Sequence, residues 1–127
     1  MHALFAHLVW TTLDRLPLID SRRANAVEAH LISISRRLDV RPLALAAAPD
    51  HVQMLIRFTP SQSLAELVRS LQTNSSDQLV RAGHPVHWSA RYSASTVSPE
   101  DVRDVMRRIG RQLPDLPSPG AASPVDA

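Results

Sequence analysis

The sequence predicts an α+β fold of the ferredoxin-like type, in which an antiparallel sheet has two helices on one face and an extra helix follows at the C-terminal end. Segments that favour extended backbone alternate with segments whose apolar residues recur at helical spacing, in the order strand, helix, strand, strand, helix, strand, helix. The chain has 127 residues, 44% of them hydrophobic, which is enough for one core and too few for two. Because this fold serves many functions, it does not identify one.

The first half of the chain predicts three strands and one helix. Residues 4–12 (LFAHLVWTT) favour a strand, and Asp20 or Ser21 can cap a helix whose apolar stripe ends near Asp39. Two further strands, 41–48 and 51–58, are expected on either side of a Pro-Asp turn. The second of these strands alternates, so four of its residues are expected to face the core: Val52, Met54, Ile56 and Phe58.

The second half predicts a helix, a pair of strands and a last helix. Ser63 and Glu66 form a capping box for a helix that is expected to fray near Asn74. A short strand at 86–88 and a longer one at 91–97 should follow. The last helix begins after Ser98-Pro99, and the residues expected to form its buried stripe are Val102, Val105, Met106 and Ile109.

The C-terminal segment differs in composition from the rest of the chain. Residues 113–127 hold four prolines, no aromatic residue and no periodicity, so they are predicted to form a flexible Pro-rich tail. One domain is therefore expected over residues 1–112.

Composition excludes several classes of site. The chain has no cysteine, which excludes a disulfide framework, a thiolate zinc site and a cysteine nucleophile. Its formal charge is only +2, although all fourteen basic residues are arginine. The apolar start of the chain is short and no basic residue precedes it, so we expect a cytoplasmic protein with no secretion signal and no membrane span.

His51 and Gln53 are the first candidates for a functional site. Because side chains alternate along a strand, these two should project side by side from one sheet face, with Val52 on the other. Two neighbouring nitrogen and oxygen donors on a rigid strand suit a metal site. The alternative is an ordinary polar pair on the exposed side of a strand.

Several motifs together resemble a known family. They are His7-Leu8-Val9-Trp10-Thr11-Thr12, Leu43-Ala44-Leu45, Pro49-Asp50-His51-Val52, Leu71 with Ser75-Ser76, and Trp88 and Tyr92 followed by Ser95-Thr96-Val97. In order and spacing, the chain from about Leu4 to Gln112 resembles the single-tyrosine HUH transposases, which include insertion-sequence TnpA enzymes and REP-associated tyrosine transposases.

The resemblance implies a homodimer that binds single-stranded or hairpin DNA and cuts it with a tyrosine on the last helix, using a divalent metal such as Mg²⁺ or Mn²⁺. It assigns the metal ligands to His51, Gln53 and Gln112, with Gln53 in place of the family's second histidine. Since these three side chains are uncharged, metal binding is expected to be weak or absent.

The catalytic position departs from the family pattern. Arg108 stands where the resemblance places the tyrosine, and arginine is not a nucleophile. Arg108 could instead pair with Asp104 or contact a DNA phosphate. Tyr92 is the chain's only tyrosine, but it matches a strand tyrosine of the family, where packing is the ordinary role. The residues expected to contact DNA are Arg57, Gln72, Arg107 and Arg111.

The function predicted is that of a transposase-like protein of DNA transposition that binds single-stranded or hairpin DNA and is catalytically impaired. Two alternatives remain at this point. One is an active metal-dependent DNA nickase and strand transferase, and the other is a structural dimer that does not bind nucleic acid.

Overall fold

A computed structural model describes residues 3–111 of the chain, and the predicted tail at 113–127 and Gln112 lie outside this range. A short 3-10 turn follows the first strand (Leu13–Arg15) and another precedes the last helix (Pro99–Asp101). The remaining elements are β1 (Leu4–Thr12), α1 (Ser21–Arg37), β2 (Arg41–Ala48), β3 (His51–Phe58), α2 (Leu64–Arg81), β4 (Trp88–Val97) and α3 (Val102–Arg111).

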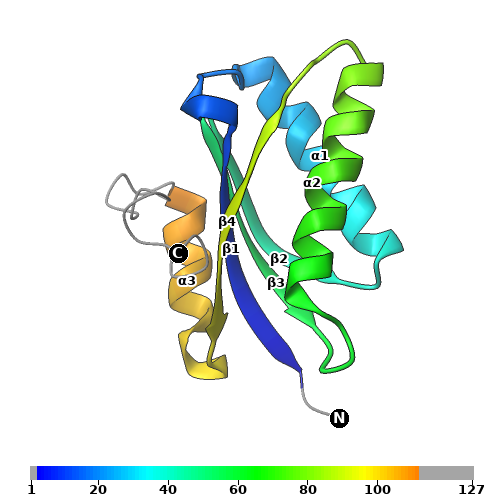
Figure 1. The fold of residues 1–127 in the computed structure, drawn as a ribbon. Coiled ribbons are helices and arrows are strands. Elements are labelled where there is room, and N and C mark those ends of the chain that lie inside the picture. Colours follow the sequence, from blue (N-terminus) through cyan, green and yellow to red (C-terminus); the bar gives the residue numbers. More distant parts are fainter. Residues whose placement is uncertain (1–2, 112–127) are drawn as a thin grey trace.

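The four strands form one antiparallel sheet in the order β2-β3-β1-β4. Helices α1 and α2 cover one face of this sheet, and α3 lies against the other face (Figure 1). The predicted ferredoxin-like fold with an extra C-terminal helix is therefore confirmed. Within the described residues, no helix is long and apolar enough to cross a membrane.

Strand β3 is buried on both sides. Val52, Met54, Ile56 and Phe58 join the main core beneath α1 and α2, as the alternation predicts. Leu55 points the other way, into a smaller core that also contains Ala46 of β2 and residues of α3. Burial of both faces holds the strand rigidly, which fixes the direction of its polar side chains.

The apolar stripe of α3 is narrower than expected. Val105 and Ile109 are buried and Val102 packs against them, but Met106 is 37% exposed. Met106 follows Val105 directly, and neighbouring residues on a helix do not share a face. The expectation that Met106 belongs to the buried stripe is wrong, and its side chain lies on the flank of α3 instead.

Two expectations about the α2–β4 region are also wrong. The second helix does not fray at Asn74 but continues to Arg81. Two serines of this helix form hydrogen bonds with the segment that leads into β4. Trp88 Nε1 donates to Ser75 Oγ at 2.9 Å, and Ser76 Oγ donates to the carbonyl of Val86 at 2.9 Å. The two strands expected at 86–88 and 91–97 form one continuous strand, β4, that begins at Trp88.

Backbone hydrogen bonds tie three segments together at the end of the sheet where β3 begins. Thr12 N donates to the carbonyl of Asp50 at 2.9 Å, and Leu13 N donates to the carbonyl of His87 at 2.8 Å. The 3-10 turn Leu13–Arg15 places Asp14 and Arg15 in the left-handed region, with φ of 55° and 54°. This turn brings the Arg15 side chain over the start of β3.

Candidate active-site face

The sheet face that α3 covers, called here the site face, carries the predicted polar pair. The β1–β3 register runs without interruption from His51 to Phe58, so the side chains of β3 alternate strictly. Val52 belongs to the core beneath α1 and α2, which places His51 and Gln53 together on the opposite face. The predicted geometry of this pair is confirmed.

His51 belongs to a chain of polar contacts at the start of β3. Its Nδ1 donates to Asp50 Oδ1 at 2.9 Å, and Arg15 Nη2 donates to Asp50 Oδ2 at 3.1 Å. Burial alone would raise the pKa of the Asp50 carboxyl, but the hydrogen bond from His51 and the charge of Arg15 outweigh burial and hold that pKa below its ordinary value. Because Nδ1 of His51 is hydrogen-bonded to Asp50, Nε2 is the ring nitrogen that could coordinate a metal.

Gln53 has a different partner. Its side chain is 1% exposed, and its Oε1 accepts a hydrogen bond from His7 Nε2 of the neighbouring strand β1 at 3.1 Å. Its amide nitrogen is buried and has no hydrogen-bond partner within the described structure. The Gln53 side chain is therefore held inside the protein, and its oxygen is engaged by His7.

Arg108 of α3 is exposed, and its positive charge acts on His7. Burial is the main cause that lowers the pKa of His7, and the positive charge of Arg108 lowers it further against the opposing effect of Gln53. Of the two roles considered for Arg108, the ion pair with Asp104 is not formed, because Asp104 pairs with Arg107. Helix α3, which packs against the site face, thus carries an exposed cation at the position assigned to the tyrosine.

The described residues do not fit a divalent metal. Gln53 Oε1 is already hydrogen-bonded, and its unpartnered NH₂ group is a donor that repels a cation. His51 Nε2 is the remaining ligand atom of the predicted pair, and Gln112 lies outside the described residues. Across residues 3–111, no group of three or more His, Cys, Asp or Glu side chains is placed to hold a metal.

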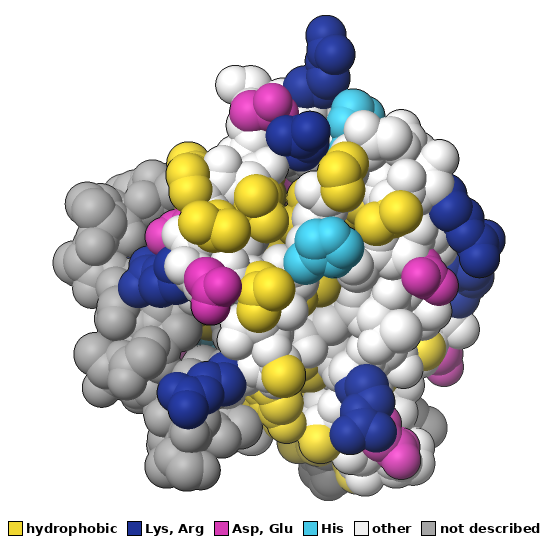
Figure 2. Space-filling view, turned by 45° about the horizontal axis from the view of Figure 1, so that its top comes forward, with side chains coloured by type: hydrophobic (Ala, Val, Ile, Leu, Met, Phe, Trp, Pro, Cys, Tyr) yellow, Lys and Arg dark blue, Asp and Glu magenta, His cyan; other side chains and the backbone are white. Residues whose placement is uncertain are grey.

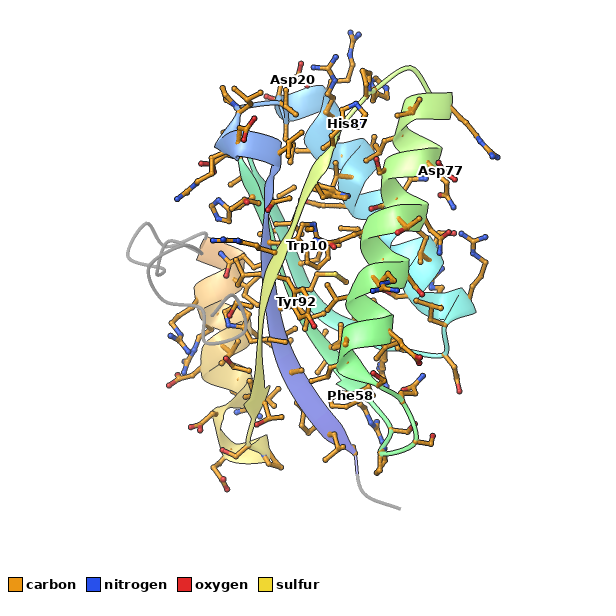
Figure 3. The ribbon with its side chains drawn as sticks, viewed as in Figure 1. Trp10, Asp20, Phe58, Asp77, His87 and Tyr92 are labelled. Atoms are coloured by element: carbon orange, nitrogen blue, oxygen red, sulfur yellow. The ribbon has the colours of Figure 1, made fainter. Side chains whose placement is uncertain are left out.

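Tyr92 lies on the wrong face of the sheet to replace a nucleophile at His51. It pairs with Trp10 across β1 and β4 and packs against the main core. Figure 3 shows Trp10 and Tyr92 on the side of the sheet that faces α2. The expected packing role of Tyr92 agrees with this position.

The four residues expected to contact DNA do not lie together. Gln72 lines a groove of about 450 Å³ between α2 and β4, where its Nε2 donates to the carbonyl of Ser89 at 3.0 Å. Arg57 lines a separate cavity at the far end of β3, and Arg107 is paired with Asp104 on α3. Arg111 is the last residue of α3. On the face shown in Figure 2, basic side chains are spread around the surface and several lie beside acidic ones.

Sequence reasoning missed three residues of the site: His7, Arg15 and the role of Asp50. Asp50 precedes His51 directly, and a carboxylate beside a histidine is a common way to orient the ring, so a local signal existed. His7 offered no such signal, because its contact with Gln53 depends on how β1 pairs with β3.

Comparison with known proteins finds relatives that are all described as transposases. The protein ISDra2 transposase TnpA from Deinococcus radiodurans is 22% identical over 120 residues, which cover 88% of this chain and 86% of the relative. A Deinococcus radiodurans protein solved as a transposase superposes with a TM-score of 0.72 at 24% identity, covering 88% of this chain and 92% of its own. A REP-associated tyrosine transposase solved with a REP hairpin gives 0.61 at 14% identity, covering 84% and 64%.

The structural likenesses support the fold, and the family assignment comes from the sequence. The model of the family described as "Transposase IS200 like" matches residues 1–112, which is most of the 127-residue chain. The chain therefore belongs to the family of IS200-like transposases.

Proposed function

We propose that this protein binds single-stranded or hairpin DNA as a transposase-type homodimer and that its strand-cutting activity is impaired. The observation that carries the proposal is Arg108 of α3, the helix that packs against the site face, because arginine stands at the position assigned to the nucleophile. Family membership supports a role in DNA transposition, and the relative solved with a REP hairpin supports a hairpin as the DNA form.

Loss of the tyrosine removes the covalent step. A tyrosine oxygen attacks a phosphodiester and conserves the bond energy in a protein–DNA adduct, whereas a guanidinium stays protonated and has no nucleophilic atom at any accessible pH. Guanidinium does bind phosphate well, through two parallel hydrogen bonds. Arg108 is thus suited to hold a DNA phosphate at the place where the family would cut it.

Metal binding is proposed to be weak. A divalent metal would polarise a phosphoryl oxygen in this type of chemistry. In this chain Nε2 is the ring nitrogen of His51 that Asp50 leaves available to a metal, Gln53 is hydrogen-bonded to His7, and the positive charge of Arg108 acts on His7. The predicted ligand Gln112 would add one neutral oxygen, which attracts Mg²⁺ or Mn²⁺ less than a carboxylate does.

DNA contacts are proposed for Arg57, Gln72, Arg107 and Arg111, in addition to Arg108. The groove that contains Gln72 also exposes parts of Trp88 and Tyr92. Aromatic side chains stack with unpaired bases, and arginines neutralise the backbone. We place the protein in the cytoplasm, where a DNA transposition function would operate.

A denaturing gel tests the catalytic part of the proposal. Wild-type protein incubated with a labelled hairpin and Mn²⁺ should form no covalent adduct, and Arg108→Tyr with Gln53→His is the smallest change expected to produce one. Tyr92→Phe should leave DNA binding nearly unchanged. An adduct formed by wild-type protein and lost in Tyr92→Phe would overturn the proposal, because the strand tyrosine would then be the nucleophile.

Binding is tested separately by fluorescence anisotropy of the same hairpin at several salt concentrations. Affinity that falls steeply with salt is expected, since neutralised phosphates release counterions. A protein that shows no salt-dependent binding to hairpins or single strands would support the alternative of a structural dimer without a nucleic-acid role.

A further inference from the structure

A basic cavity lies at the end of the sheet opposite His51. Its volume is about 590 Å³, and it is formed where α1 ends and where β2 begins beside the end of β3. Phe58, which lines this cavity, marks the lower end of the sheet in Figure 3, whereas His87 lies at the upper end. Three arginines line it and define what is called here the arginine cavity: Arg36, Arg41 and Arg57.

The strand register forces two of these cations together. Arg41 of β2 is the direct antiparallel partner of Arg57 of β3. Side chains of such a pair project from the same face with their Cβ atoms roughly 5 Å apart, and like charges in this arrangement are destabilising. Arg36, in the last turn of α1, lines the same cavity from the side of the sheet that α1 covers.

The protein does not neutralise this charge within its described part. The acidic partners of Arg15, Arg23 and Arg107 are within ion-pair distance, but no carboxylate of residues 3–111 approaches the three cavity arginines within 4.0 Å. Asp39 is the single acidic residue in the lining, against three guanidinium groups. An excess of positive charge therefore remains open to solvent, because all three arginines are exposed.

We infer that the arginine cavity binds backbone phosphates of the DNA, as a second anchor remote from His51. This inference rests on the proposed function and extends it to Arg36 and Arg41. A guanidinium matches the geometry of phosphate with two parallel hydrogen bonds, and three arginines around one cavity favour a polyanion. A phosphate bound between Arg41 and Arg57 would also remove their mutual repulsion.

The position of the cavity indicates which part of a hairpin it contacts. Arg57 and His51 project from the same face of β3, six residues apart, which corresponds to about 20 Å along a strand. Phosphates along one strand of a duplex advance about 3.4 Å per base pair. A hairpin with one end at His51 would thus place its stem at the arginine cavity after about six base pairs.

The test compares two double variants with the same loss of charge. Arg41→Gln with Arg57→Gln removes the facing pair, whereas Arg37→Gln with Arg81→Gln removes two exposed arginines that do not line the cavity. Hairpin affinity is measured by fluorescence anisotropy between about 50 and 200 mM salt. The cavity variant should bind on the order of tenfold more weakly, and the slope of log affinity against log salt should fall by about one to two, at roughly 0.9 per lost phosphate contact.

Two further measurements separate the causes of any loss. The thermal midpoint of the cavity variant should be no lower than that of wild type, because a repulsive pair is removed. A methylphosphonate placed in the stem about six base pairs from the hairpin end should weaken binding of wild type and leave the cavity variant unaffected. The charge-matched variant should respond to that substitution as wild type does.

The outcomes distinguish this inference from the proposed function. Wild-type protein that binds no DNA would overturn both. Wild type that binds DNA, with a cavity variant whose salt slope and affinity equal those of the charge-matched control, would overturn the arginine cavity alone. Calorimetric binding of inorganic phosphate that is abolished in the cavity variant, without any change in DNA affinity, would also overturn it and would indicate a small-anion site.

Discussion

Substitution of Gln53 by methionine tests whether this position is held by the protein's own packing. The buried amide nitrogen has no partner, which costs about 1–3 kcal/mol, while the hydrogen bond from His7 to Oε1 contributes about 1 kcal/mol. Gln53→Met keeps the length of the side chain and removes both polar groups. Because Gln53→Met also leaves His7 Nε2 without its acceptor, part of this gain is lost, and the free energy of unfolding should rise by at most about 1 kcal/mol, or about 4 °C in thermal midpoint.

Gln72→Met is the matched control, because the amide nitrogen of Gln72 donates to the carbonyl of Ser89 at 3.0 Å. The same substitution there removes a satisfied group and should lower the free energy of unfolding by about 1 kcal/mol. Urea unfolding followed by tryptophan fluorescence measures both variants. If Gln53→Met destabilises the protein by more than about 1 kcal/mol, the amide nitrogen has a partner and the reasoning is refuted.

Three further predictions concern other polar groups. Burial lowers the pKa of His7 in the folded protein. The contribution of His7 to stability is therefore complete above its pKa in the unfolded chain, about 6.5, and is lost as the pH falls toward its pKa in the folded protein. His7→Phe should show a smaller drop in thermal midpoint between about pH 7.5 and 5.5 than wild type does. Ser75→Ala leaves Trp88 Nε1 without its acceptor and should cost about 1–2 kcal/mol in urea unfolding. Asp50→Ala removes the acceptor that keeps the proton of the neutral His51 ring on Nδ1. The ¹⁵N NMR spectrum of the ring should then change from one tautomer to a mixture of two. An unchanged spectrum would mean that another group orients the ring.

Local signals in the sequence predict most of the fold because they act over a few residues. Ser63 caps α2 by accepting a hydrogen bond from Glu66 N, and Asp20 caps α1 by accepting one from Arg23 N. Both caps could be predicted from side chains three positions apart. The true end of α2 could not be predicted in this way. The hydrogen bond between Ser75 and Trp88 depends on how β4 packs against α2, and the local sequence carries no signal for that contact.

The candidate site was predictable only in part, for the same physical reason. The common face of His51 and Gln53 follows from the period of a strand. That Gln53 is bonded to His7 instead of lying open follows from the β1–β3 register, which brings together residues 46 positions apart. The side of the sheet that α3 occupies, and hence the approach of Arg108, depends on how the last helix packs onto β2 and β3.

The order of the strands has a consequence for how the site moves. Strands β1 and β3 are the two inner strands of the sheet, so the backbone amides beside His7, His51 and Gln53 are protected by a neighbour on each edge. Amides in such positions exchange with deuterium mainly when the whole domain opens, whereas edge strands exchange through local fraying. We therefore expect the backbone that carries His7, His51 and Gln53 to exchange slowly, and the arrangement of these three side chains should persist for as long as the sheet remains folded.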